Sequence, residues 1–411
     1  TACANATSAI LAAINKKGLP HTFTADDATN GAFQAPNDMT KVEGLAANLE
    51  AYSGQTVDVI FAAVPKADPM TLCVITVVTG VSGSGKSTLV RDVLYAALKR
   101  HYGGVVDHVG SCLKVQGSLH LLTDVELVDQ NPIGKSTRSN PATYLKAFDE
   151  IRRLYAEQPL AKQMGYTPGF FSFNSQGGRC DVCQGEGVIT VPMQFMADVE
   201  LKCEHCGGRR FNDEVLEVRY KGKNIHEVLE MTAEEGKEFF KALPKIAPKM
   251  NTMCDVGLGY IKIGQSSTTL SGGEAQRIRL ATQIGSSLMG VLYILDEPSI
   301  GLHQRDNDKL LATLKKLRDV GNTLIVVEHD EDTMREADYI VDIGPGAGIH
   351  GGEVVACGTP HEIMQNEKSL TGLYLSGRKK IQIPAERRNG NGNFLSVYGA
   401  AENNLKNVDV S

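Results

Sequence analysis

GVSGSGKST, at residues 80–88, is the stretch that decides the fold. It follows the β-branched run 74–78 and precedes residues 89–98, which have the composition of a helix. A strand, a glycine-rich loop, Lys-Ser and a helix in this order predict a phosphate-binding loop rather than an ordinary Gly/Ser turn. Glycines let backbone N–H groups turn inward at a positively polarised helix N-terminus. We therefore expect a nucleoside triphosphate to contact the whole loop: Gly80, Val81, Ser82, Gly83, Ser84, Gly85, Lys86, Ser87 and Thr88.

Within this loop, two side chains have predicted chemical roles. Lys86 is placed to reach the β- and γ-phosphates, and the Ser87 hydroxyl is placed to ligate Mg²⁺. Both roles follow from the position of Lys-Ser at the start of the helix. They predict Mg²⁺ as a cofactor.

Length and charge narrow the function classes. The chain has 411 residues, enough for two or three domains, and 42 basic against 48 acidic side chains. Balanced charge excludes a global basic field, so any nucleic-acid surface must be a local patch. There is no apolar run of the roughly 18 residues that a membrane span needs. The chain starts with Thr and its alanine-rich beginning lacks a basic stretch, which we interpret as a truncated N-terminus rather than a signal peptide.

Cysteine spacing predicts a metal site. Four of the nine cysteines form two C-x-x-C pairs, Cys180/Cys183 and Cys203/Cys206, with nineteen residues between the pairs. This spacing favours a four-thiolate Zn²⁺ site in a reducing cytoplasm over a disulfide framework. Four thiolates leave no open coordination position, so the site is predicted to be structural. Residues 188–202 alternate as a β-hairpin that the metal would hold at its base.

A second block of motifs begins near residue 257. LYILDEP, at residues 292–298, is an apolar strand that ends in Asp296 and Glu297, where Asp296 would hold Mg²⁺ and Glu297 would orient the attacking water. TTLSGGEAQ, at residues 268–276, places Ser271 and two glycines at a helix start, which is a second anion site. Since one copy already has a phosphate cradle, this second site makes sense if it closes on the nucleotide of a neighbouring copy. His329, which follows the predicted strand 323–327, is expected to contact the γ-phosphate.

These motifs together resemble ABC-type ATPases, and more specifically the UvrA family of bacterial nucleotide excision repair. The resembling stretches, which include VDQNPIGKSTRSNPATY, CDVCQGEG, CEHCGGRRFN, ILDEPSIGLHQRDND and VVEHDEDTMREADYIVDIGPGAG, cover roughly residues 74–411. The resemblance implies an α/β P-loop fold with a helical signature region and an inserted four-cysteine module. It implies ATP hydrolysis by Glu297, His329 and Lys86, Gln130 as a sensor of metal and γ-phosphate, and Ser271, Gly272 and Gly273 as a partner's half of the site.

The resemblance also implies double-stranded damaged DNA as a partner and a cytoplasmic protein. Three basic residues beside the second cysteine pair, Lys202, Arg209 and Arg210, are candidates for phosphate contacts, with a solvated basic rim as the alternative. A head-to-tail homodimer or a full-length UvrA-like partner is expected to complete the ATP site. Docking of a UvrB-like partner is doubtful because the corresponding insertion is missing after the P-loop.

The order of the pieces departs from the family. Residues 74–268 resemble the second ATPase unit, residues 270–380 the end of the first, and residues 394–410 the opening strands of the second. We therefore expect a truncated or spliced chain whose C-terminal strands fold back onto the P-loop sheet. The expected division is an unassigned α/β segment (1–72), the P-loop part (73–178), the zinc module with an α/β insertion (179–256), the signature, acidic-strand and histidine part (257–386), and a linker with further strands (387–411).

Two functions stay open at this stage. The chain is an ATPase of UvrA type, or it is a recombined fragment that binds zinc and perhaps ATP without turnover. An ABC transport ATPase is disfavoured, since the zinc module has no place there and no membrane-coupling feature is visible.

Overall fold

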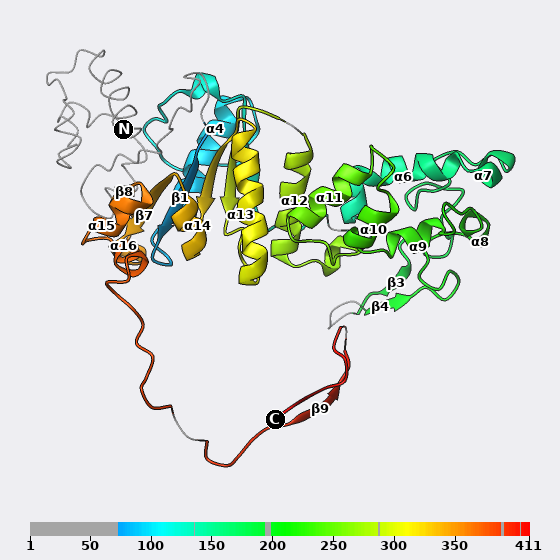
Figure 1. Cartoon of the computed structure of the whole chain (residues 1–411). Coiled ribbons are helices and arrows are strands. Elements are labelled where there is room, and N and C mark those ends of the chain that lie inside the picture. The colour runs from blue at the N-terminus through cyan, green and yellow to red at the C-terminus, as the bar shows by residue number, and fades with distance from the viewer. Residues whose placement is uncertain (1–72, 135, 194–198, 287, 388–389, 403) are drawn as a thin grey trace.

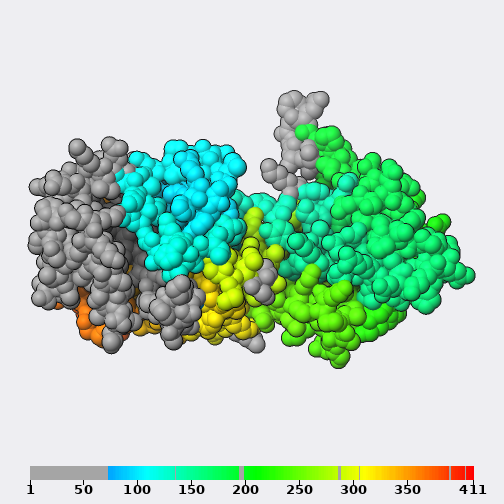
Figure 2. Space-filling view, turned by 90° about the horizontal axis from the view of Figure 1, so that it is seen from above, coloured from blue at the N-terminus to red at the C-terminus, as the bar shows by residue number. Residues whose placement is uncertain are grey.

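The computed structural model describes residues 73–411 except 135, 194–198, 287, 388–389 and 403. The sequence also predicts short helices at residues 7–14 and 42–51 and a buried strand at 56–64, and all three lie outside the described residues. A six-stranded sheet and a helical lobe lie at opposite ends of the described body (Figure 1), and Figure 2 shows the same body from above, with the residues of the lobe in green. None of the helices in the described ranges has the length and apolar character of a membrane span.

The sheet joins two distant parts of the sequence. Its order is β2-β5-β6-β1-β7-β8; the first five strands are parallel and β8 is antiparallel to β7. The strand before the P-loop and the strand before Asp296 therefore lie in one sheet, separated by a single strand. The strands are β1 (Ile75–Gly80), β2 (Asp124–Val128), β5 (Val291–Asp296), β6 (Thr323–Val327), β7 (Tyr339–Gly344) and β8 (Glu353–Gly358).

Apolar residues on both sides of the central strands explain why the sheet is buried. On β1, Val77 packs into a core with helices α12 and α13, whereas Val78 packs into a second core with η2 and α4 on the opposite face. Near-continuous apolar runs are typical of parallel strands covered on both faces. The covering helices are η2 (Thr88–Tyr95), which runs on into α4 (Ala96–His101), α12 (Gly272–Ser286), α13 (Gln304–Asp319), α14 (Glu331–Glu336), α15 (Pro360–Gln365) and α16 (Leu370–Leu375).

The helical lobe has its own aromatic core. Phe148, Phe171, Phe173, Phe211 and Phe240 are buried there. Side-chain caps define several helix starts: Asn140 accepts the Thr143 N–H before Pro141, and Asn224 and Thr232 form capping boxes with glutamates three residues later. The helices are α5 (Pro141–Tyr144), α6 (Ala147–Ala156), α7 (Pro159–Gln163), α8 (Asp213–Leu216), α9 (Ile225–Leu229), α10 (Ala233–Phe239) and α11 (Ala247–Asp255).

Several local predictions are confirmed and one is wrong. The predicted hairpin exists as β3 (Val188–Val191) paired with β4 (Val199–Lys202), and the predicted strand 323–327 is β6. The sequence also predicts a strand at residues 215–220, and this prediction is wrong: helix α8 covers Val215 and Leu216, and a tight turn joins Tyr220 to Lys223. Alternation misled here because Val215, Leu216 and Val218 all pack into the lobe core instead of lining one strand face.

The expected return of the C-terminal strands to the main sheet is also wrong. β9 (Val397–Ala400) and β10 (Val408–Val410) pair with each other as a separate two-stranded sheet. In Figure 1 this hairpin stands away from the body at the end of an extended segment. Its strands exist where expected, but β1 already has parallel neighbours on both sides, so no edge of the P-loop strand is free to receive them.

Removal of residues 389–411 should therefore leave the stability of the body unchanged. The described side chains of this hairpin, such as Tyr398 at 72% and Val410 at 60% exposure, contribute little buried area. We expect the melting temperature measured by calorimetry to change by less than about 2 °C. A sharp drop would mean that the segment does pack on the body in solution.

Candidate functional site

The phosphate-binding loop has the conformation that its glycines predict. Gly80, Gly83 and Gly85 have φ angles of 134°, 77° and 99°, a region that favours glycine. A Cβ on Gly80 would lie 1.9 Å from the Ile343 carbonyl oxygen, so no side chain fits between β1 and β7 at this point. The helix that follows begins at Lys86.

Lys86 lies over the loop itself. Its Nζ donates to the carbonyl oxygens of Gly80, at 3.2 Å, and Val81, at 2.9 Å, and the residue is 6% exposed. Burial lowers the pKa of Lys86, and the carboxylates of Glu297 and Asp296 oppose that shift. The ammonium group is thus held by weak carbonyl partners that phosphate oxygens can replace. Ser87 and Thr88 are exposed beside it, whereas Ser84 is buried and its hydroxyl has no hydrogen-bond partner among the described residues.

A second loop, residues 344–352, braces the cradle from outside. The N–H groups of Gly348 and Gly352 donate to the carbonyl oxygens of Gly83, at 3.0 Å, and Ser84, at 2.9 Å. No role was assigned to this stretch from the sequence alone. Its many glycines could have indicated one, because glycine often marks a place where another backbone approaches closely. These two hydrogen bonds fix the backbone of the phosphate-binding loop at Gly83 and Ser84.

The predicted acids and histidine meet beside this cradle. β1, β5 and β6 are parallel neighbours, so their C-terminal ends share one edge of the sheet. The N–H of Glu297 donates to the Val327 carbonyl oxygen at 2.9 Å, and Glu297 Oε1 lies 3.6 Å from His329 Nε2. Burial and the neighbouring Glu297 raise the pKa of Asp296. Arg91 and Lys86 oppose this shift without cancelling it, so a further cation beside the two acids would be favoured.

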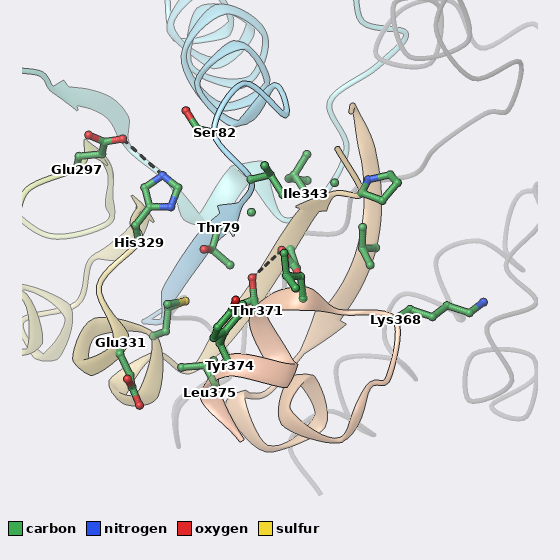
Figure 3. Close-up of a pocket in the computed structure, with 18 residues that line it drawn as sticks. Thr79, Ser82, Glu297, His329, Glu331, Ile343, Lys368, Thr371, Tyr374 and Leu375 are labelled. Atoms are coloured by element: carbon green, nitrogen blue, oxygen red, sulfur yellow. Dashed lines mark hydrogen bonds and ion pairs between the residues drawn. The ribbon is translucent and has the colours of Figure 1, made fainter. Parts of the chain in front are cut away.

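Glu297, His329 and the first residues of the phosphate-binding loop line a pocket of about 660 Å³ (Figure 3), whereas Asp296 and Lys86 are not among its lining residues. Glu297 and His329 face each other at one end, and Thr371 and Tyr374 lie on the opposite wall. Sequence reasoning missed Asp342, which is 4% exposed and accepts hydrogen bonds from Ser369 Oγ at 2.6 Å and Thr371 Oγ1 at 3.1 Å. Burial raises the pKa of Asp342. No local motif marks this acid, because its partners lie 27 and 29 residues further along the chain.

Two glutamines reach the end of β5. Gln130, predicted as a sensor, has its Nε2 3.4 Å from the Asp296 carbonyl oxygen. Gln276, which was missed, donates from Nε2 to the carbonyl oxygens of Val128 at 2.9 Å and Asp296 at 2.7 Å. It therefore links the ends of β2 and β5 to helix α12. The sequence could have indicated this contact, because Gln276 lies one helical turn after Gly272, on the side of the helix that faces the sheet.

Ser271 caps helix α12. Its N–H donates to Glu274 Oε2 at 2.8 Å, and its Oγ accepts the Glu274 N–H at 3.3 Å. Tyr260 donates from its hydroxyl to the other oxygen of Glu274 at 2.7 Å. Ser271 itself is exposed, and Gly272 packs beside Gln130. The predicted second anion site is therefore a capped helix start that faces solvent in one copy of the chain.

The four cysteines form one buried cluster. The sulfur atoms of Cys180, Cys183, Cys203 and Cys206 all lie within 4.8 Å of one another, and those of Cys183 and Cys206 are 3.7 Å apart. Tetrahedral Zn–S bonds of about 2.3 Å require sulfurs about 3.8 Å apart. The Gly187 N–H donates to Cys183 Sγ at 3.3 Å, a bond typical of metal-bound thiolates. Burial raises the pKa of the Cys183 thiol to about 12.

The three basic candidates beside this cluster differ in their surroundings. Lys202 is exposed on β4. Arg209 is paired with Asp213 at 2.9 Å and donates to the Cys206 carbonyl oxygen at 3.0 Å. Arg210 lies over the Phe173 ring, 5.7 Å from its centroid, and burial lowers its pKa.

Comparisons with known proteins cover most of the chain. No protein-family model matches it. It is 54% identical over 299 residues to UvrABC system protein A of Aquifex aeolicus, which is 72% of this chain and 32% of that protein. The protein of the same name from Escherichia coli K12 is 51% identical over 302 residues, which is 73% of this chain and 32% of that protein.

A solved structure supports the same relationship. UvrA2 from Deinococcus radiodurans is 47% identical, with a TM-score of 0.70, over 79% of this chain and 38% of that one. The chain spans about a third of the length of the curated relatives that it matches. The matched part of this chain belongs to the UvrA family of ABC-type ATPases.

Proposed function

We propose that this chain is an ATP-hydrolysing, DNA-binding protein of UvrA type that takes part in recognising damaged DNA in nucleotide excision repair. The observation that carries the proposal is the convergence of Lys86, Asp296, Glu297 and His329 at one edge of a parallel sheet. The likeness to UvrA proteins supports the repair context and a cytoplasmic location.

In this proposal each residue has a defined task. The cradle N–H groups and Lys86 bind the β- and γ-phosphates, and His329 contacts the γ-phosphate. Glu297 orients a water molecule, whose oxygen bonds to the γ-phosphorus as the bond to ADP breaks. Glu297 accepts the proton of this water. Ser87 and Asp296 offer the hard oxygen ligands that suit Mg²⁺, which when bound supplies positive charge to the phosphates.

Glu297→Gln keeps the size of the side chain but removes the base. We expect kcat for ATP to fall at least about a hundredfold, since general bases of this kind contribute that much or more. Turnover is measured with purified chain, with and without damaged duplex, beside Glu157→Gln on the exposed end of the helical lobe as the control. Equal hydrolysis by wild type and Glu297→Gln would favour the alternative of a catalytically inactive fragment.

We also propose that the site is completed between copies, because Ser271 faces solvent at a capped helix start. Ser271→Asp retains a good helix cap but places a negative charge where the partner's γ-phosphate would lie. Lys86→Ala removes the phosphate contact on the other side. Each variant alone should be inactive.

A mixture of these two variants should regain activity. In a head-to-tail dimer of one copy of each, one of the two sites contains both an intact Lys86 and an intact Ser271. Random pairing predicts about a quarter of the wild-type rate at saturating ATP. A mixture that is no more active than its separate components would contradict a shared site, as would a wild-type rate that stays proportional to protein concentration down to nanomolar dilution.

We propose Zn²⁺ as the ion of the four-cysteine cluster. The buried sulfurs, their spacing and the N–H···S bond of Gly187 fit a structural tetrathiolate site. The ion would hold the β3–β4 hairpin, and exposed Lys202 on that hairpin is the best placed of the three basic candidates for a DNA phosphate.

Metal analysis tests this assignment. The purified chain should carry about one zinc per molecule. Cys203→Ser should lower that content and make the hairpin peptides exchange hydrogen faster, because a buried ligand is lost. Cys357→Ser, at an exposed cysteine outside the cluster, is the matched control. A wild-type chain that contains no zinc after growth with added zinc would rule the assignment out.

A further inference from the structure

A second glutamate lies close to the acid–histidine pair, and the proposed mechanism does not use it. Glu328 precedes His329 directly and is 2% exposed. Glu297, in contrast, has a side chain that is 39% exposed and faces the pocket (Figure 3). The buried position of Glu328 excludes it as a base for a water molecule in the pocket. A buried carboxylate also needs hydrogen-bond donors to compensate its charge.

Backbone N–H groups from two different loops supply these donors. Glu328 Oε1 accepts the N–H of Ser299 at 2.8 Å. Glu328 Oε2 accepts the N–H groups of His329 at 2.8 Å and Asp330 at 3.3 Å. Ser299 belongs to the loop that follows Glu297, and the other two residues form the loop that carries the histidine. One carboxylate thus holds both catalytic loops.

The neighbouring contacts leave little freedom in these loops. The N–H of Ile300 donates to the Glu297 carbonyl oxygen at 3.2 Å. Asp330 Oδ2 accepts from Asn307 Nδ2 at 2.7 Å and from the Thr333 N–H at 2.8 Å. His329 therefore lies between two acids that are each fixed to a different element. The backbone of His329 is held in this way, and its imidazole ring extends into the pocket, where Nε2 lies near Glu297.

We propose that Glu328 is a positioning residue that sets the separation of Glu297 and His329 by binding the backbone of both loops. This inference rests on the proposed function for its effect on turnover, but not for its effect on the loops. A negative charge is needed because all three contacts are N–H donors, and an amide offers only one acceptor oxygen. In Glu328→Gln, the NH₂ group must face at least one N–H donor.

The first measurement follows the loops without any turnover. Hydrogen–deuterium exchange is read by mass spectrometry on peptides that cover residues 297–303 and 327–333. Glu328→Gln should speed exchange about tenfold in at least one of these loops, because a backbone hydrogen bond to a charged acceptor is lost. Glu336→Gln, at an exposed glutamate of α14 paired with Lys315, is the matched control and should leave both peptides unchanged.

The second measurement is a double-mutant cycle in turnover. Glu328→Gln should lower kcat by about ten- to a hundredfold, the size expected from slight misplacement of catalytic groups, with KM within about twofold. Because Glu328 acts through His329, His329→Ala should cost much less in the Glu328→Gln background than in the wild type. Glu328→Asp retains the negative charge on a side chain that is shorter by one methylene. It should show a smaller loss of kcat and a smaller coupling to His329→Ala.

Each outcome decides the inference. Unchanged exchange in both loops would overturn it, as would losses in kcat that add fully in the double mutant. If Glu328→Gln does not fold, the same two measurements on Glu328→Asp replace it. A wild-type chain without any turnover contradicts the proposed function, and the exchange result then decides the positioning role by itself.

Discussion

Parallel pairing of β1, β5 and β6 is the constraint on which the site depends. Parallel strands end at the same edge of a sheet, so the P-loop must meet the acid pair and the histidine loop, although both lie more than 200 residues later in the sequence. The bond from the Glu297 N–H to the Val327 carbonyl oxygen continues this pairing one residue beyond β5. Glu297 has a φ of 48°, so its side chain leaves the strand direction there and faces His329.

Much of this arrangement could be predicted because its signals are local. The glycine spacing of residues 80–88, the acids at the end of an apolar run and the spacing of the cysteines each require only a short window of sequence. The strand at 323–327 and the hairpin at 188–202 could be predicted for the same reason. The strand expected at 215–220 failed because its apolar residues pack into a helical core built from distant phenylalanines, and a local alternation cannot reveal that core.

The residues that sequence reasoning missed act through long-range contacts. Asp342, Gln276 and the loop 344–352 contact backbone or side chains that lie far away in the sequence. Glu328 was visible beside His329, but its role depends on Ser299, 29 residues earlier in the chain. The expected return of the C-terminal strands failed for a related reason. A resemblance in sequence can identify two segments as strands. Which strands they pair with depends on which sheet edges the rest of the fold leaves free.

In the proposed function, the charges around Lys86 make the binding of nucleotide and of cation depend on each other. Glu297, Asp296 and Asp342 all act on this one ammonium group, so carboxylates outnumber cations at the cradle. Triphosphate alone would add further negative charge beside the acid pair, where burial and the neighbouring Glu297 already raise the pKa of Asp296. A divalent cation held by Asp296 would supply positive charge that offsets both penalties. Glu328 is separated from this surplus of negative charge, because it is 2% exposed and its carboxylate is enclosed by three N–H donors.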